Sequence, residues 1–169
     1  MHLADAVFVS LYLADMSHFG AVNEAYCQYF GAQPPSRACV QCTPTPLSTP
    51  LSAGSDCERP VVWVSAVIAP HSYEAMQRGV HGVRQSLHVQ SISHWAPLCI
   101  GPYCQANVVR DALVLIAGQI GLRPADMVLW PDAARQTAQS FRNTARIAAC
   151  LGSNMTQALS LTIYMPAVG

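Results

Sequence analysis

The chain has 169 residues, of which 51% are hydrophobic and only 11% are charged, a length that suits one domain of ordinary size or slightly more. Nine arginines and no lysine balance nine acidic residues, which argues against nucleic acid as a partner, and no apolar run approaches the roughly 20 residues of a membrane span. Because so few charges are available to cover a soluble domain, we expect part of the surface to be buried against a partner or against missing chain.

The first part of the chain predicts a strand, a helix and a second strand. Residues 6–14 form an apolar, β-rich run, and Ser17 is a suitable N-cap for a helix over 18–30. The apolar and aromatic residues of that segment recur at helical spacing: Phe19, Val22, Tyr26, Tyr29 and Phe30. Gly31 is placed to end the helix, and 37–42 reads as the next strand.

In the middle of the chain, segments with a clear secondary-structure pattern lie next to an ambiguous one. Residues 43–60 are rich in proline, serine and threonine and predict a long loop. Residues 61–69 predict a buried strand. Residues 70–86 are ambiguous, with a short helix around 73–84 weakened by two glycines, and 87–95 alternates as a strand does.

The last third predicts a strand pair or bent strand over 107–117, with Arg110 and Asp111 at its turn. It is followed by the clearest helix of the chain, 132–150, which begins at Asp132. We expect the apolar face of this helix to be buried, and its members are Ala134, Ala138, Phe141, Ala145, Ala148 and Ala149.

A final strand is predicted over 157–165, and it matches the first one. The run AVFVSLYLA from Ala6 and the run ALSLTIYMP from Ala158 share apolar positions at an offset of 152 residues. If the match reflects a repeat, the chain contains the second half of one α+β unit followed by the first half of the next.

The cysteines and histidines do not predict a metal site. Seven cysteines without a signal peptide indicate a cytoplasmic setting with reduced thiols. Cys39 and Cys42 have the spacing of a metal or redox pair, but no second pair completes a zinc site, so we interpret them as packed thiols. The six histidines are scattered without ligand spacing.

Several motifs in this order resemble a known family. IGPYCQA at 100–106, LIAGQIGLRP at 115–124, the long helix and LSLTIYM at 159–165 are similar to the first half of a RidA domain of the YjgF, or Rid, superfamily. Residues 9–41 resemble its second half. The resemblance implies an α+β fold, a RidA/chorismate-mutase-like mixed sheet with two long helices on one face, and a pseudo-trimeric or homo-oligomeric assembly.

The resemblance also predicts a domain order. Residues 1–69 would be the C-terminal half of one RidA-like repeat, 70–92 a linker and 93–169 the N-terminal half of a second, truncated repeat. This order is similar to the tandem RidA-like region of eukaryotic diphthine–ammonia ligases, which implies ATP as a cofactor of a parent ligase only and elongation factor 2 as a protein partner. The chain has no lysine and no Ser-Gly-Gly-Lys-Asp-Ser loop, so we expect a fragment, splice form or truncated product without the ATP-pyrophosphatase domain.

The resemblance assigns candidate ligand-binding residues. Arg37 matches the arginine that binds a substrate carboxylate, and a guanidinium fork suits that role because it makes two parallel charge-assisted bonds. Tyr103 matches a tyrosine at the rim of the pocket, and Gly118 matches a glycine that lets backbone approach a ligand. Cys39 matches a cysteine near the pocket, where we expect it to pack rather than react.

Two positions depart from the family pattern. Ser65 stands where the family has a proton-transferring glutamate, and Ala117 stands where it has a serine. We therefore expect an accessory or oligomerisation module that supports the ATP-dependent amidation of diphthine, without the catalytic domain, and we assign no catalytic residue. The alternative is a stand-alone enamine/imine deaminase whose pocket uses Arg37 and Tyr103, which come from different repeats.

Overall fold

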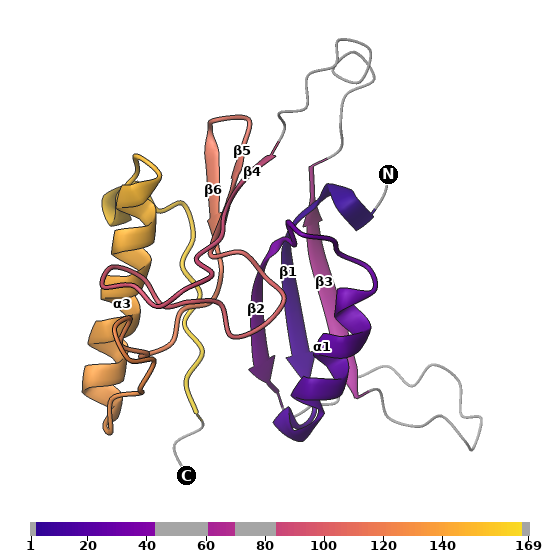
Figure 1. Ribbon diagram of the computed structural model, residues 1–169, viewed down its shortest axis with the longest axis horizontal. Helices are drawn as coiled ribbons and strands as arrows, with labels where there is room; N and C mark the ends of the chain where they lie inside the picture. The colour runs from indigo at the N-terminus through magenta and orange to yellow at the C-terminus, as the bar shows by residue number, and fades with distance from the viewer. Residues whose placement is uncertain (1–2, 43–60, 70–83, 167–169) are drawn as a thin grey trace, which may run out of the picture.

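The computed structural model describes residues 3–42, 61–69 and 84–166. This part of the chain forms two three-stranded sheets, with one helix over the first sheet and a longer helix on the far side of the second (Figure 1). The predicted α+β class is confirmed. The loop expected at 43–60 and most of the segment expected to hold a short helix, 70–83, lie outside the described residues.

The first sheet has the order β2-β1-β3. The central strand β1 (Ala6–Leu13) pairs in parallel with β2 (Ser36–Gln41) and antiparallel with β3 (Val62–Ile68). A short 3-10 turn, Leu3–Asp5, leads into β1. Fully buried and half-buried residues alternate along most of β1, as expected for a strand whose two faces are covered unequally. The strands predicted over 6–14 and 37–42 are confirmed.

Helix α1 (Phe19–Cys27) covers one face of this sheet (Figure 1). Its side chains Val22 and Tyr26 pack on the buried residues of β1. The prediction of Ser17 as N-cap is wrong, because Ser17 lies inside a 3-10 turn, Met16–His18, whose cap is Asp15. The Asp15 carboxylate accepts a 2.8 Å hydrogen bond from the Ser17 amide, which lowers the pKa of that carboxyl.

The second sheet is an antiparallel ladder of three short strands, β4 (Arg84–Leu87), β5 (Ala106–Val109) and β6 (Leu113–Ile116). The turn predicted between the last two is confirmed: Arg110 and Asp111 both have φ of 53°, the left-handed conformation that tight hairpins require.

The strand predicted over 87–95 is wrong, since β4 ends at Leu87. The following segment is held instead by the buried side chain of Gln105. Its Oε1 accepts a 2.6 Å bond from the Val89 amide, and its Nε2 donates at 2.8 Å to the Pro97 carbonyl. Side-chain bonds therefore replace the expected ladder.

Helix α3 (Ala133–Cys150) begins where predicted, with the Asp132 carboxylate accepting from the Arg135 amide at 2.8 Å. The predicted buried face is wrong. Apart from Ala148, which is buried, and Ala145, which is half-buried, its members are exposed, and the buried residues are Gln139, Asn143, Ile147 and Ala148. The face that carries Asn143 is buried because the Asn143 Nδ2 donates to the carbonyls of Ile120 at 3.2 Å and Leu122 at 3.0 Å. A further 3-10 turn, Met155–Gln157, follows the helix.

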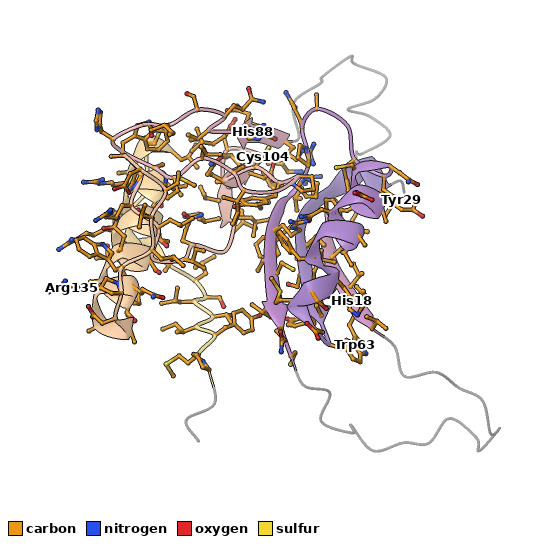
Figure 2. The ribbon with its side chains drawn as sticks, turned by 60° about the horizontal axis from the view of Figure 1, so that its bottom comes forward. His18, Tyr29, Trp63, His88, Cys104 and Arg135 are labelled. Atoms are coloured by element: carbon orange, nitrogen blue, oxygen red, sulfur yellow. The ribbon has the colours of Figure 1, made fainter. Side chains whose placement is uncertain are left out.

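The two sheets meet along the outer edge of β2. Ser36 and Cys104 form a parallel bridge, and Figure 2 shows Cys104 where the two halves approach each other. The Gly118 amide donates at 3.0 Å to the Arg37 carbonyl. The side chain of Asn107 donates at 3.0 Å to the Val7 carbonyl, so the buried polar groups of one half are satisfied by the other.

Two segments expected to be strands, the first of them buried, are largely exposed. Strand β3 is correctly placed, but Val64 is 65% exposed, because β1 is the only described strand that pairs with β3. The final strand predicted over 157–165 is wrong: the segment 158–166 is not part of a described ladder, and Leu159 is 88% exposed. None of the described helices is long and apolar enough to cross a membrane.

Candidate functional site

A cleft of about 220 Å³ opens where the two halves of the molecule meet. It is smaller than the roughly 300–1,000 Å³ of sites for drug-sized ligands, and so fits a small molecule. Its walls come from β2, from the start of α1 with the turn before it, and from the loops around 97–105 and 118–122. The lining residues are Met16, Phe19, Arg37, Cys39, Pro97, Leu98, Ile100, Tyr103, Gln105, Gly118, Gln119, Ile120 and Leu122.

Arg37 is the one charged residue of this lining, and it is only 3% exposed. Three aromatic rings surround its guanidinium carbon, with ring centres at 4.8 Å for Tyr26, 5.4 Å for Tyr103 and 5.8 Å for Phe19. Burial lowers the pKa of the guanidinium, but an arginine stays charged at neutral pH. Its Nη1 is buried and has no hydrogen-bond partner among the described residues. Within the described part of the chain, this positive charge therefore has no counter-ion.

Tyr103 closes the other side of the guanidinium. Its own amide bonds to the Gly101 carbonyl at 2.9 Å, and its phenol oxygen accepts a long 3.5 Å bond from the Ile100 amide. Burial raises the pKa of the phenol, so it keeps its proton at neutral pH. The structure thus brings together Arg37 and Tyr103, which are 66 positions apart in the sequence.

Cys39 and Gly118 line the same cleft. Burial raises the pKa of the Cys39 thiol, and the positive charge of Arg37 only partly opposes this, so the group is a thiol at neutral pH and a poor nucleophile. A Cβ at Gly118 would lie 3.4 Å from both Cα and Cβ of Ala38, so the glycine lets the loop lie close along β2. All four residues singled out from the sequence therefore border one cavity.

The comparisons with known proteins agree with this arrangement. A family model described as Endoribonuclease L-PSP matches residues 1–51 and 94–167, well over half of the chain. The chain belongs to this family, the RidA family. The match leaves out 52–93, which contains β3 and β4.

The curated relatives of this RidA chain include two diphthine–ammonia ligases. The one from Saccharomyces cerevisiae is 36% identical over 128 residues, which are 70% of this chain and 16% of the relative. The one from Schizosaccharomyces pombe is 37% identical over 123 residues, which are 72% of this chain and 16% of the relative. The chain thus spans about one sixth of the length of these relatives. No solved structure matches it.

No carboxylate lines the cleft of this RidA chain among the residues that the structure describes. Ser65, which the resemblance predicts to replace a glutamate, pairs with Ser10, whereas Arg37 pairs with Val9. Because successive residues of a strand point to opposite faces, Ser65 lies on the face of the sheet away from Arg37. Ala117 is buried and does not line the cleft. The described residues also contain no group of side chains that could hold a metal ion.

The sequence reasoning missed the aromatic walls of the site. Their helical spacing predicts only a helix face for Phe19 and Tyr26; Tyr26 does pack in the core and Phe19 is half-buried, but both rings also lie beside the guanidinium of Arg37. Their spacing of seven residues places them on one helix face, which was the available signal. The role of Gln105 in holding the loop over the cleft could not be inferred, since it depends on tertiary hydrogen bonds.

Proposed function

We propose that this chain is a RidA-type module that binds a small carboxylate and serves as an accessory part of a diphthine–ammonia ligase system. One observation carries the proposal: a buried arginine that has no counter-ion among the described residues borders a small cleft whose described lining holds no carboxylate. A positive charge without a counter-ion in the protein interior is unfavourable, and a bound anion supplies the counter-charge.

The ligand class follows from the other walls. Most of the lining is apolar or aromatic, and the uncharged polar groups are few: the Tyr103 phenol, the Gln105 and Gln119 amides and the Cys39 thiol. A carboxylate on a short chain, as in an amino acid or an oxo acid, matches one guanidinium beside an apolar wall of this size. The site has no described group that could store a proton for hydrolysis, so binding without turnover is the better-supported outcome.

The alternative is a stand-alone enamine/imine deaminase. The observation that favours it is the contact of Arg37 with Tyr103, since it pairs a carboxylate-binding group with a phenol in one cleft. Such an enzyme would need a water activated by groups other than a carboxylate of the described lining. We rank this function second for that reason.

Binding and turnover are separated by two measurements on the full chain. Titration with propanoate, followed by NMR or calorimetry, is expected to show saturable binding that is lost in Arg37→Ala and weakened in Arg37→Lys, because an ammonium cannot form the paired bonds of a guanidinium. Arg142→Ala is the matched control, since Arg142 is exposed on α3. A coupled assay on freshly generated 2-aminoacrylate is expected to show no turnover. Turnover that Arg37→Ala abolishes would favour the deaminase, and wild-type chain that binds no propanoate would contradict the carboxylate module.

The ligase context rests on the named relatives and on the exposed surface. Those relatives join ammonia to diphthine by name, and this chain matches about one sixth of their length. The uncharged strand β3 and the segment 158–166 leave apolar side chains exposed, which supports an oligomeric module or docking to the ATP-using part of such a ligase, and through it to elongation factor 2. Sedimentation of the wild type and of Val64→Lys measures the oligomeric state. A monomeric wild-type chain would contradict the oligomeric module.

A further inference from the structure

Behind the cleft, the structure leaves three buried polar atoms without partners among the described residues. They are Oδ1 of Asn23, the hydroxyl of Tyr26 and Nη1 of Arg37. Buried polar atoms are nearly always hydrogen-bonded, so three such exceptions close together call for a physical explanation.

These atoms belong to side chains that converge on one place. Asn23 and Tyr26 are three positions apart on α1 and therefore share a face, and the Tyr26 ring centre is 4.8 Å from the guanidinium carbon of Arg37. A Cβ built on Gly101 would lie 2.8 Å from Nη2 of Arg37 and 3.6 Å from Nδ2 of Asn23. The Asn23 and Arg37 side chains thus both approach Gly101, and the Tyr26 ring lies beside the same guanidinium.

The three groups are chemically complementary to a water molecule. The guanidinium only donates, the amide oxygen only accepts, and the phenol does both. Burial raises the pKa of Tyr26 to about 12, so its hydroxyl keeps its proton at neutral pH. A buried water typically makes about three hydrogen bonds to otherwise unsatisfied groups.

We propose that Asn23, Tyr26 and Arg37 together bind one enclosed water molecule that positions the guanidinium for the cleft. In this arrangement α1 orients the arginine from behind, while the bare backbone of Gly101 leaves room for its Nη2. Asn23 and Tyr26 are thus positioning residues, and their effect on carboxylate affinity rests on the proposed function. The water site itself does not.

A high-resolution crystal structure of the full chain tests the water directly. One water peak is expected within hydrogen-bonding distance of all three atoms in the wild type, and it is expected to be lost or displaced in Tyr26→Phe, which keeps the ring but removes the hydroxyl. An empty space in the wild type, or direct bonds among the three side chains, would overturn the proposal.

Propanoate titration tests the positioning role with isosteric variants. Asn23→Asp is expected to pair with Arg37, weakening propanoate binding about tenfold or more without a lower melting temperature, because an internal carboxylate competes with the bound one. Thr137→Asp adds the same charge at an exposed position of α3 and is expected to leave affinity unchanged. If Asn23→Asp folds and binds as the wild type does, the positioning role is wrong. If Asn23→Asp fails to fold, Tyr26→Phe decides instead. It is expected to bind propanoate several-fold more weakly than the wild type, and unchanged propanoate binding would contradict the positioning role.

The two proposals fail in different ways. A wild-type chain that does not bind propanoate contradicts the carboxylate module, while the water peak still decides the enclosed site. A wild-type chain that binds propanoate but shows no water peak contradicts only the enclosed site.

Discussion

The hydroxyl oxygens of Tyr12 and Tyr164 lie 3.2 Å apart, and their rings meet edge to face with centres 6.4 Å apart. The two residues are separated by 152 positions, the offset at which the runs from Ala6 and Ala158 match in sequence. The contact therefore joins equivalent positions of the two matching runs. The repeat itself stays a prediction, since 158–166 does not form a strand like β1.

The Tyr12 contact is expected to hold the segment 158–166 against the first sheet. Replacing Tyr164 with alanine removes both the ring contact and the hydrogen bond, so amide exchange across the segment should become faster. Because both side chains are partly exposed, the free energy of unfolding should fall by only about 1 kcal/mol.

Tyr164→Phe is the matched control, since it keeps the ring and loses the hydroxyl. It should leave most of the protection in place. Exchange that is equally fast in wild type and Tyr164→Ala would show that the tyrosine pair does not anchor the segment.

Alkaline pH should destabilise the fold through Tyr26. Burial raises the pKa of its phenol above the usual 10.0 to about 12, and the nearby positive charge of Arg37 opposes this only in part. A pKa raised by folding contributes stability that is complete below pH 10 and is lost as the pH rises through about 12. Denaturant unfolding measured from pH 8 to 12 should show this decline, and the decline should be shallower in Tyr26→Phe. Equal slopes for the two proteins would contradict it.

Cys39 should be a slow thiol. Its pKa is raised by burial, whereas Cys27, Cys42 and Cys150 are exposed. Since only the thiolate is alkylated, iodoacetamide at neutral pH should label the exposed cysteines first, as peptide mass spectrometry can measure. Labelling of Cys39 ahead of them would indicate an activated nucleophile and would reopen a catalytic role for it.

Sequence reasoning succeeded where local chemistry decides the structure. The turn at Arg110 and Asp111, the start of α3 at Asp132 and the strand β1 all depend on neighbouring residues, and all are confirmed. The convergence of Arg37 and Tyr103 came from matching motifs, since neither spacing nor periodicity could place two distant segments side by side.

Several of the wrong predictions equate hydrophobicity with a place in the folded core. The apolar residues of β3 predict a buried strand and those of 157–165 a final strand, yet Val64 and Leu159 are exposed, because burial also requires a neighbour that covers the side chain. In α3 the same assumption chose the alanine face over the one that carries Asn143. Asn143 is buried because two backbone carbonyls need its amide, and that demand arises only in the folded chain.

Gly121 should tolerate alanine least among the glycines of the second half. A Cβ there would lie 2.5 Å from Cα and 2.6 Å from Cβ of Gln136, on the first turn of α3, so the helix itself would have to move. Overpacking of this kind typically costs about 1–3 kcal/mol. Gly121→Ala should therefore lower the free energy of unfolding by that amount in denaturant titration. The loop before it lines the cleft, so its displacement should also weaken propanoate binding.

Gly31→Ala is the matched control for Gly121→Ala, because a Cβ at Gly31 meets no atom within 4 Å. Its effect should stay within about 0.5 kcal/mol, as for most surface substitutions. The effect of Gly118→Ala on the free energy of unfolding should lie between those of Gly31→Ala and Gly121→Ala, since its Cβ would meet Ala38 at a tight but possible 3.4 Å. If Gly121→Ala proved as stable as Gly31→Ala, the close packing of α3 against the 118–122 loop would be wrong, and with it the wall that this loop forms beside Arg37.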